Sequence, residues 1–545
     1  MTCAPSRDNR PYCMKRLPLH YILALTAILP ASAANPYLPL WEHIPDGEPY
    51  LFDDPDRPGT KRVYVYGSHD MLRTQYCGTD QVVWSAPADS LDCWRYDGVI
   101  FESRLDADGN PLHSDGRGDV LYAPDVTEVT GPDGKKTYYL YPNNQESGRT
   151  GMVAKSDRPD GPFEVINWSA DNPQATTGIL GFDPAVFVDD DGRVYAYWGF
   201  GNSYACELDP KTMTTPFPGT ELVKDIVTGF KEDGDGRFYE ASSIRKIGDK
   251  YVFIYSRVSA DGEWGLPSTN YTLAYAYGDS PLGPFTYGGT IIDARGRDTD
   301  AYGNPIVTAT PNGNTHGSLL NVNGRWWVFY HRQTGVDEYA RQAMVAPVEV
   351  EVTPGPGGKV TITEAEYTSE GFETGGLDPL RRYPAAIASH FTGPMPARQK
   401  YPVVNYSGPY FEPSYCDDHN IPDPYGDDVN CNRVVNNTDG SVLGYKYFDF
   451  GRLYGRKNIR LLIDLIPEDV PGTIEVYTSA PWKGNPVPAG RYRLGEQPSS
   501  APVRIEIPLD GVSELSGKHP LYLAFSSPRS GVSICSITHL QFVCE

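Results

Sequence analysis

The sequence predicts an all-β protein in which a five-bladed β-propeller is followed by a smaller, jelly-roll-like β-sandwich. Two observations carry this prediction: one strand pattern recurs five times in the first two thirds of the chain, and different short strands fill the last third. The composition agrees, because 55 Gly, 49 Pro and 38 Tyr among 545 residues do not suit helix bundles or coiled coils, which are rich in Ala, Leu, Glu and Lys. With 39% hydrophobic residues, the chain can bury a core, which excludes disorder as its main state.

The N-terminus has the features of a secretory signal. Lys15 and Arg16 precede an apolar run at residues 22–29, and small residues follow at 31–34. This order is typical of a cleaved signal peptide, and the run is too short to span a bilayer permanently. We therefore expect residues 1–34 to be a signal peptide, with Met14 as an alternative start. The mature protein would be secreted, periplasmic or exposed at the cell surface, without a membrane span.

The five repeated segments are residues 62–66, 137–141, 193–197, 250–255 and 325–330. Each alternates aromatic or β-branched residues with others, the period-2 pattern of a strand. The repeat length suits four-stranded blades with loop insertions. We expect the propeller to occupy residues 35–368. The alternative is a set of unrelated hairpins in a β-sandwich.

The pattern changes after about Glu366, where a Gly-, Pro- and Arg-rich stretch marks a boundary. Beyond it, short alternating strands at residues 445–450, 459–465, 472–477, 503–507 and 519–525 have the spacing of a β-sandwich. The second domain is therefore expected at residues 369–545.

The cysteines are consistent with an oxidising compartment. Three close pairs are candidates for disulfides, and in that scheme Cys206 has no partner. The pairs are Cys77 with Cys93, Cys416 with Cys431, and Cys535 with Cys544.

The charge excludes one class of partner. The chain has 70 acidic and 47 basic residues and a formal charge of -23. Such a chain repels phosphate backbones, so we expect no nucleic-acid partner.

Three acidic residues stand in polar turns beside the predicted strands: Asp46, Asp183 and Glu240. In a closed propeller, equivalent strand ends from successive blades meet at the central axis, so these carboxyls would share one pocket. Like charges and desolvation would then separate their pKa values, as a general acid and a general base require. The alternative for each residue is that it caps a turn.

The order of these motifs resembles glycoside hydrolase family 43 over roughly residues 35–365. The matching positions are Asp46, 123–125, Asp183-Pro184, Tyr239-Glu240, 315–318 and 326–331. The family consists of five-bladed propellers that are inverting glycosidases. The resemblance implies that Asp46 is the general base and Glu240 the general acid, and that Asp183 orients Glu240 and keeps its pKa high.

The first motif departs from the family pattern. Many members have Asp directly before Pro, whereas Gly47 and Glu48 intervene here before Pro49. Glu48, and after it Asp53 or Asp54, therefore remain rivals of Asp46 for the role of the base.

The resemblance also implies binding residues. His316 would help to hold a hydrated calcium or sodium ion at the axis, although a hydrogen-bonded core histidine is the equal alternative. No cofactor is required for the expected reaction. Arg341 matches a position that contacts substrate. Trp84, Trp94 and Trp198 are candidate sugar platforms, of which at most one is expected to serve, since most tryptophans of a propeller are core. The C-terminal stretch resembles a family 6 carbohydrate-binding module.

The expected function is a secreted, exo-acting, inverting glycosidase whose partner is an oligo- or polysaccharide. An α-L-arabinofuranosidase or β-xylosidase is the leading hypothesis, and a β-D-galactofuranosidase or β-galactosidase is the enzymatic alternative. A non-catalytic carbohydrate-binding propeller is the alternative of another class. The oligomeric state stays open.

Overall fold

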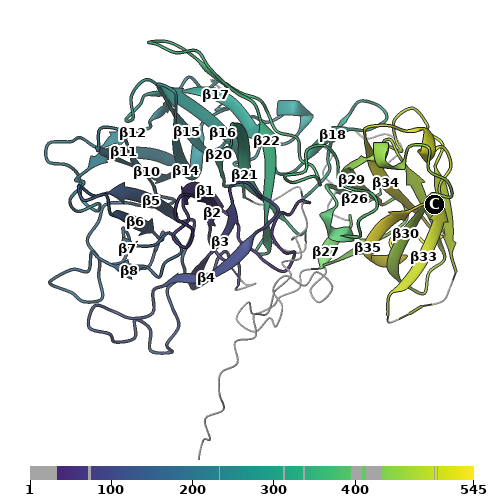
Figure 1. Cartoon of the computed structure of the whole chain (residues 1–545), viewed down its shortest axis with the longest axis horizontal. Helices are drawn as coiled ribbons and strands as arrows, with labels where there is room; N and C mark the ends of the chain where they lie inside the picture. The colour runs from purple at the N-terminus through teal and green to yellow at the C-terminus, as the bar shows by residue number, and fades with distance from the viewer. Residues whose placement is uncertain are drawn as a thin grey trace, which may run out of the picture.

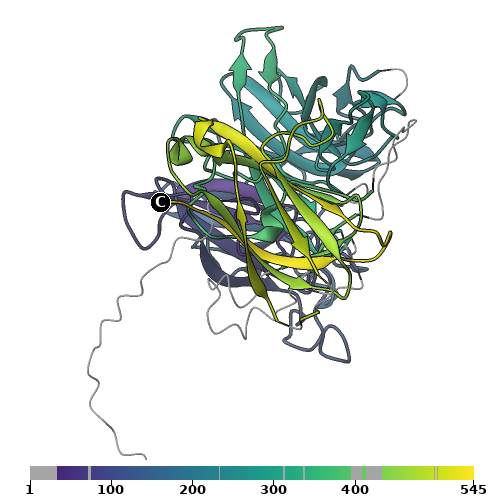
Figure 2. The same cartoon turned by 90° about the vertical axis from the view of Figure 1, so that its right-hand side faces the viewer.

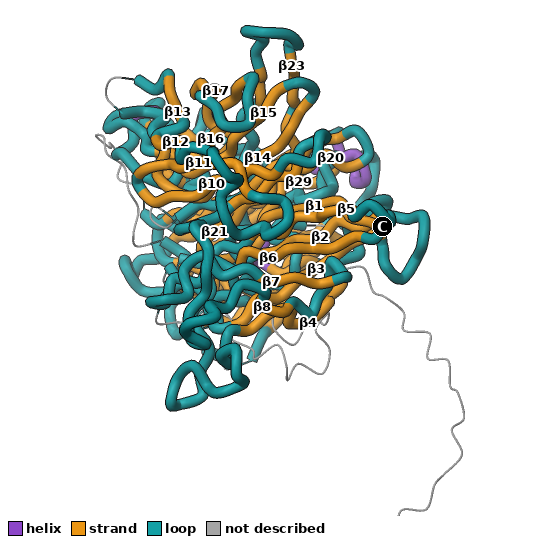
Figure 3. Tube along the Cα trace, turned by 90° about the vertical axis from the view of Figure 1, so that its left-hand side faces the viewer, coloured by secondary structure: helices purple, strands orange, loops and turns teal. Residues whose placement is uncertain are grey.

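A computed structural model describes residues 34–71, 75–231, 234–310, 314–335, 338–394, 408–412, 432–495, 498–499 and 501–545. The chain forms two β-rich bodies, a propeller and a sandwich that ends at the C-terminus (Figure 1). Nearly all of the drawn trace is strand or loop (Figure 3). Residues 1–33 of the expected signal peptide, together with Cys416 and Cys431, lie outside the described residues.

Five sheets form the blades, and their strands pair antiparallel except for one pair in blade 4. The strands of each blade are given in chain order. Blade 1 contains β1 (Glu48–Asp53), β2 (Lys61–Tyr66), β3 (Asp80–Pro87) and β4 (Arg95–Glu102). Blade 2 contains β5 (Asp125–Thr130), β6 (Lys136–Tyr141), β7 (Ala154–Ser156) and β8 (Glu164–Val165). Blade 3 contains β9 (Ala185–Val188), β10 (Val194–Phe200), β11 (Asn202–Leu208) and β12 (Val223–Lys224).

Blade 4 contains β14 (Phe238–Ile247), β15 (Lys250–Arg257), β16 (Thr272–Gly278) and β17 (Phe285–Ile292), and β13 (Val227–Thr228) pairs with β17 in parallel. Blade 5 contains β20 (Ser318–Val322), β21 (Arg325–Gln333) and β22 (Arg341–Val348). Two hairpins extend from the propeller: β18 (Arg297–Thr299) with β19 (Pro305–Val307), and β23 (Val350–Val352) with β24 (Val360–Ile362).

The N-terminal segment closes the ring. The Asn35 side chain donates to the Val345 carbonyl at 2.7 Å and accepts from the Val345 amide at 3.0 Å, and the Tyr37 amide donates to the Ala343 carbonyl. This segment therefore lies along β22, on the side where the other blades have a fourth strand.

The five repeated segments are strands, as predicted, but each is the second strand of its blade: β2, β6, β10, β15 and β21. Their alternation reflects burial on both faces. Val63 and Val65 of β2 pack towards blade 5, whereas Tyr64 and Tyr66 pack towards blade 2. Each blade packs between two neighbouring blades, so its second strand needs apolar side chains on both faces. This explains why the sequence pattern is strongest in the second strand.

The C-terminal body consists of two packed sheets, which confirms the predicted sandwich. One sheet has the order β27 (Tyr410–Glu412), β28 (Arg433–Asn437), β35 (Cys535–Val543), β30 (Arg460–Pro467) and β33 (Val503–Pro508), with β25 (Tyr383–Pro384) also paired to β35. The other has the order β26 (His390–Thr392), β29 (Val442–Asp449), β34 (Lys518–Ser526), β31 (Gly472–Tyr477) and β32 (Gly490–Leu494).

Helical structure in the described residues is limited to short 3-10 turns: η1 (Glu263–Gly265), η2 (Ala385–Ile387), η4 (Phe450–Leu453) and η5 (Val512–Glu514). Within those residues, no helix has the length and apolar character needed to cross a membrane.

The two bodies share a core. One hydrophobic cluster joins Val328 and Met344 of blade 5 to Phe391, Phe411 and Val434 of the sandwich. The guanidinium of Arg332, next to His331 in β21, donates to the carbonyls of Ala386 and Ala388 and lies over the ring of Phe411. In Figure 2 the sandwich lies in front of the propeller.

The structure contradicts two predicted disulfides. Cys77, Cys93, Cys206, Cys535 and Cys544 are all free. Cys77 and Cys93 lie beyond opposite ends of β3, and Cys535 and Cys544 at opposite ends of β35. Strands of eight or nine residues separate such ends by roughly 25–30 Å, whereas a disulfide needs Cα atoms within about 7 Å.

Candidate active site

Three acidic residues meet at the propeller axis. Asp46 lies two residues before β1, Asp183 two residues before β9, and Glu240 is the third residue of β14. All three side chains are buried. In a ring of five blades, blades 3 and 4 lie across the axis from blade 1, so Asp46 faces Asp183 and Glu240.

The backbone at these positions is unusual. Asp46 has φ 60° and Asp183 has φ 50°, and Ala241, directly after Glu240, has φ 68° at an irregularity in the pairing of β14 with β15. A left-handed conformation costs a residue with a side chain about 1–2 kcal/mol. Such strained residues gather at functional sites, where the surrounding fold holds them.

Asp46 is held as an anion. Its carboxylate accepts from Ser68 Oγ and lies 3.1 Å from Arg341 Nη1, and its backbone amide donates to His331 Nδ1 at 3.1 Å. Burial alone would raise the Asp46 pKa, but the charge of Arg341, with smaller contributions from His331 and the Ser68 hydrogen bond, keeps it below its usual value.

Asp183 is held by blade 2 and blade 4. Asn143 Nδ2 donates to its Oδ1 at 2.8 Å, and the Ala241 amide donates to its Oδ2 at 2.9 Å. His316 Nδ1 lies 3.7 Å from Oδ2. Burial and the neighbouring carboxyls of Glu240 and Asp46 raise the pKa of Asp183 well above its usual value. The bond from Ala241 fixes Asp183 beside Glu240.

Glu240 is the carboxyl with the least support for a negative charge. Burial raises its pKa to about 8, with a further contribution from the charge of Asp46. Asp183 accepts two hydrogen bonds that favour its anion, whereas Glu240 lies next to it as the second acidic group of a buried pair. A proton on this pair is therefore best placed on Glu240.

The rivals of Asp46 lie in other surroundings. Glu48 forms an ion pair with Arg245 and accepts from Ser243 Oγ at 3.1 Å. Asp53, at the far end of β1, is exposed and pairs with Lys61 and Lys136. Asp54 lies 3.7 Å from Arg62 Nη1. None of these three carboxylates contacts Arg341 or His331 among the hydrogen bonds and ion pairs of the described residues.

The chain is similar in sequence to known proteins. The family model described as glycosyl hydrolases family 43 matches residues 63–352. A xylosidase/arabinosidase of Thermoclostridium stercorarium is 33% identical over 473 residues, covering 83% of this chain and 88% of the relative. The chain belongs to glycoside hydrolase family 43.

A more distant relative carries a different activity name. A β-D-galactofuranosidase of Aspergillus niger is 27% identical over 218 residues, which is 39% of this chain and 55% of that protein. Among solved structures, a family 43 arabinoxylan arabinofuranohydrolase from Bacillus subtilis, in complex with cellotetraose, has a TM-score of 0.44 and 21% identity over 94% of this chain and 97% of that one. As a family 43 member, the chain is an inverting glycoside hydrolase that acts on O-glycosyl bonds.

The predicted sugar platforms do not fit the structure. Trp84 is fully buried and its indole N–H donates to Glu42 at 2.7 Å. Trp94 is buried against Tyr37, and Trp198 is 8% exposed and stacks on Tyr204 in the core of blade 3. These side chains fill the space between blades, so they offer no open face to a sugar.

The prediction that Arg341 contacts substrate does not fit either. Only 1% of the surface of Arg341 is accessible to solvent. Its Nε and Nη2 bind the two oxygens of Asp70 at 2.8 and 2.7 Å, and Nη1 lies near Asp46 and Asn314. With all three guanidinium nitrogens engaged, Arg341 positions Asp46.

His316 lies at the axis, beside Asp183, but it is not one of a compact set of metal-type ligands in the described residues. Burial lowers its pKa, so the ring is neutral near pH 7. Within the part of the chain that the structure describes, the one compact group of three metal-type ligands is His113, Asp119 and Glu146, which does not include His316. An ion beside His316 would therefore have to be largely hydrated.

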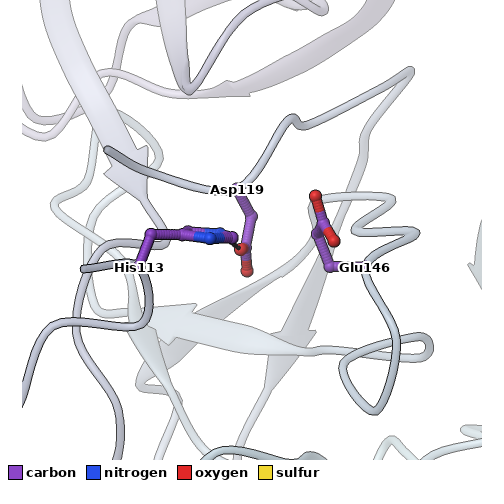
Figure 4. A group of neighbouring side chains, drawn as sticks. All are labelled: His113, Asp119 and Glu146. Carbon is purple, nitrogen blue, oxygen red and sulfur yellow. Dashed lines mark hydrogen bonds and ion pairs between the residues drawn. The ribbon is translucent and has the colours of Figure 1, made fainter. Parts of the chain in front are cut away.

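The His113, Asp119 and Glu146 group is a brace between loops. His113 and Glu146 lie on either side of Asp119 (Figure 4). Asp119 accepts from His113 Nε2 at 2.7 Å, from Arg149 Nη2 at 2.7 Å and from Asn144 Nδ2 at 2.7 Å. The Arg149 charge already neutralises Asp119, which disfavours a cation. The group instead fixes the loop that carries Asn143, the donor to Asp183.

Several residues of the site could not be recognised from the sequence alone. Asp70 neutralises Arg341, and Asn143 and Ser68 hold the carboxylates. Asn and Ser in loops are too common to be distinctive.

Asp125 of the 123–125 motif accepts from Tyr50 at 2.7 Å and from the Val186 amide at 2.6 Å, so it joins blades 1, 2 and 3 at the axis.

Proposed function

We propose that this chain is an exo-acting inverting glycosidase that releases terminal pentosyl residues, α-L-arabinofuranosyl or β-D-xylosyl, from polysaccharide. The observation that carries the proposal is the difference in protonation between Asp46 and Glu240, which face each other across the propeller axis. Asp46 is stabilised as an anion by Arg341, whereas Glu240 is buried beside a second carboxyl and retains its proton. One site thus offers a base and an acid at the same pH.

The two carboxyls have complementary roles. Glu240 donates its proton to the glycosidic oxygen as the bond to the anomeric carbon breaks. Asp46 accepts a proton from a water molecule, whose oxygen attacks the anomeric carbon from the opposite face. The product therefore has the inverted configuration, and the two carboxyls need room for the water between them. Asp183 orients Glu240 through the hydrogen bond from the Ala241 amide, and repulsion between these two neighbouring carboxyls favours one proton on the pair.

The names of the relatives support the choice of sugar. The Thermoclostridium stercorarium relative, matched over most of both chains, is a xylosidase/arabinosidase. The Aspergillus niger relative supports β-D-galactofuranoside as the second candidate. Small changes in a pocket discriminate between such sugars by only a few kcal/mol, so a direct test is needed.

The test is a panel of nitrophenyl α-L-arabinofuranoside, β-D-xyloside, β-D-galactofuranoside and β-D-galactoside, with arabinan, xylan and galactan as natural substrates. We expect turnover of one or both pentosides, and NMR at early times should show inversion at the anomeric carbon. Turnover of galactofuranoside alone would select the second candidate. A lack of hydrolysis of every substrate in the panel would favour a non-catalytic carbohydrate-binding propeller.

We also propose that residues 1–34 direct export and are removed. The support is the order of basic, apolar and small residues at 15–34. N-terminal sequencing of the mature protein from the producing cell checks this, with a first residue at or beside Asn35 as the expected result.

The sandwich, which resembles a family 6 module, is proposed to brace the propeller. Trp482 Nε1 donates to the Thr299 carbonyl at 2.7 Å, Lys483 pairs with Asp298, and the Phe391 amide donates to the Thr308 carbonyl at 2.7 Å. These contacts hold the β18–β19 hairpin, which precedes Asn314 and His316 in the chain.

A further inference from the structure

Phe200 is an exposed aromatic residue beside the carboxyl site. It is the last residue of β10 and lies at the tip of the β10–β11 hairpin. Its side chain is 57% exposed, although most aromatic residues of blade 3 are in the core. An exposed phenylalanine is by itself common, so its position has to be judged from the backbone and the neighbouring rings.

The backbone on both sides of Phe200 is tied to the residues that precede two of the site's carboxyls. The Gly199 amide donates to the Phe182 carbonyl at 2.8 Å, and the Gly201 amide donates to the Tyr239 carbonyl at 2.6 Å. Phe182 directly precedes Asp183, and Tyr239 directly precedes Glu240. Phe200 is therefore fixed relative to both carboxyls, and β10 and β14 lie side by side in adjacent blades (Figure 1).

This placement requires glycine on both sides. Gly199 has φ 151°, and a Cβ there would lie 1.9 Å from the Asn202 carbonyl oxygen; Gly201 has φ 72°. A side chain at Gly199 would clash with the backbone, and one at Gly201 would be strained. The tight hairpin thus presents the Phe200 ring next to the site instead of folding it into the blade.

A continuous aromatic wall includes Phe200. Its ring centroid is 5.4 Å from that of Phe182 and 5.1 Å from that of Tyr239. The wall continues from Phe182 to Tyr122 and from Tyr239 to Tyr271, with centroids 5.7 and 5.5 Å apart. Burial and the nearby Glu240 carboxyl raise the pKa of Tyr271, which places this end of the wall beside Glu240.

The wall lies on the side of the site where the leaving group must be. Glu240 protonates the oxygen of the departing sugar, whereas Asp46 and Arg341 lie across the axis with the attacking water. A sugar attached to that oxygen therefore meets the aromatic wall. Aromatic faces bind the C–H face of a pyranose ring, and Phe200 is the ring of the wall with the most free surface.

We propose that Phe200 is the platform for the leaving-group sugar, a pyranose residue of a polysaccharide or oligosaccharide. The proposal deepens the proposed glycosidase function and rests on it. Phe200 then decides which glycosides are efficient substrates, by contributing affinity on the leaving-group side without taking part in proton transfer.

The test compares two substrates that share one released sugar. The first is an oligosaccharide whose leaving group is a pyranose, and the second is the methyl glycoside, whose leaving group has no ring. We expect Phe200→Ala to lower kcat/KM for the oligosaccharide about tenfold, the value of one good ring contact, and to leave the methyl glycoside within about twofold. Phe200→Trp should retain most activity on both substrates.

Phe217→Ala is the matched control, since Phe217 is a 43% exposed phenylalanine of the same blade outside the wall; it should change neither substrate. Equal losses on both substrates in Phe200→Ala would mean that the hairpin merely supports the site. An unchanged kcat/KM for the oligosaccharide would equally overturn the proposal.

Calorimetric binding of the oligosaccharide separates this proposal from the proposed function. Glu240→Gln and the double variant Glu240→Gln with Phe200→Ala are titrated without turnover, and the double variant should bind about tenfold more weakly. If wild-type protein hydrolyses nothing but this difference appears, the glycosidase function fails and the sugar platform stands. If hydrolysis occurs but the affinities agree, only the platform fails.

Discussion

The guanidinium of Arg341 binds Asp46 and Asp70 at once. Nη1 lies 3.1 Å from Asp46 Oδ1, and Nε and Nη2 lie 2.8 and 2.7 Å from the two oxygens of Asp70. One buried cation thus serves two buried carboxylates from different loops. Asp70 fixes the orientation of the guanidinium, and the guanidinium keeps Asp46 ionised, as a base requires.

The Arg341 contact predicts the pH dependence of turnover. Because the Asp46 pKa is lowered and the Glu240 pKa is raised to about 8, kcat/KM should be flat near neutrality. It should fall as the pH rises through about 8, when Glu240 loses its proton, and on the acid side only below the ordinary Asp value of ~3.9.

Arg341→Met should lower kcat/KM at least tenfold and move the acid limb of the profile to higher pH, since Asp46 loses its cation. Arg341→Lys keeps the charge and should move the acid limb less. The profiles are measured on protein whose fold is checked by circular dichroism. An acid limb that stays in place in Arg341→Met would show that Asp46 is not the titrating base.

Glu240→Gln tests the acid through its dependence on the leaving group. General acid catalysis contributes roughly 10²–10⁴-fold, so kcat on an oligosaccharide should fall by about that factor. A dinitrophenyl glycoside, whose leaving group needs no proton, should lose far less. Near-normal turnover of the oligosaccharide by this variant would exclude Glu240 as the acid.

Comparing Asp46→Asn with Glu48→Gln shows which of the two carboxylates acts as the base and which stabilises the fold. Asp46→Asn should abolish turnover with little change in the melting temperature. Glu48→Gln leaves the buried Arg245 without its anion, so it should lower the melting temperature and retain measurable kcat in the folded fraction. The reverse pattern would make Glu48 the base. Activity and thermal unfolding are measured on the same preparations.

The shared core predicts how the protein unfolds. Because one hydrophobic cluster spans blade 5 and the sandwich, calorimetry should show one cooperative transition for both bodies. Arg332→Met removes donors to Ala386 and Ala388 and should lower the temperature of that single transition. Two separated transitions in the wild type would mean that the sandwich does not brace the propeller.

Chelation tests the role of an ion. The proposed proton transfers belong to Glu240 and Asp46, and His316 is in no compact group of three metal-type ligands among the described residues, so we expect prolonged dialysis against EDTA to leave kcat/KM unchanged. A loss of activity that calcium restores would show that an ion at the axis is needed.

Much of the fold followed from local patterns. Five strands with apolar residues on both faces predicted five blades. Each blade packs between two neighbouring blades, so its strands must be apolar on both faces. The strands of the sandwich were visible for a different reason: strands such as β33 (Val503–Pro508) alternate buried and exposed residues, because only one face packs against the other sheet. Sequence could not tell that these strands are the second of each blade, because a first strand such as β9 (Ala185–Val188) has only four residues, all apolar, and is too short to show a regular alternation.

The sequence by itself determined which carboxylates to consider, because Asp46, Asp183 and Glu240 stand at fixed places relative to the strands. Only the tertiary structure decided their environments. Arg341 is 295 positions from Asp46 and Asn143 is 40 from Asp183, and no local pattern specifies such pairs. Burial separated the aromatic residues in the same way: Trp84 is in the core whereas Phe200 is at the site, because a residue's exposure depends on what the other blades place against it.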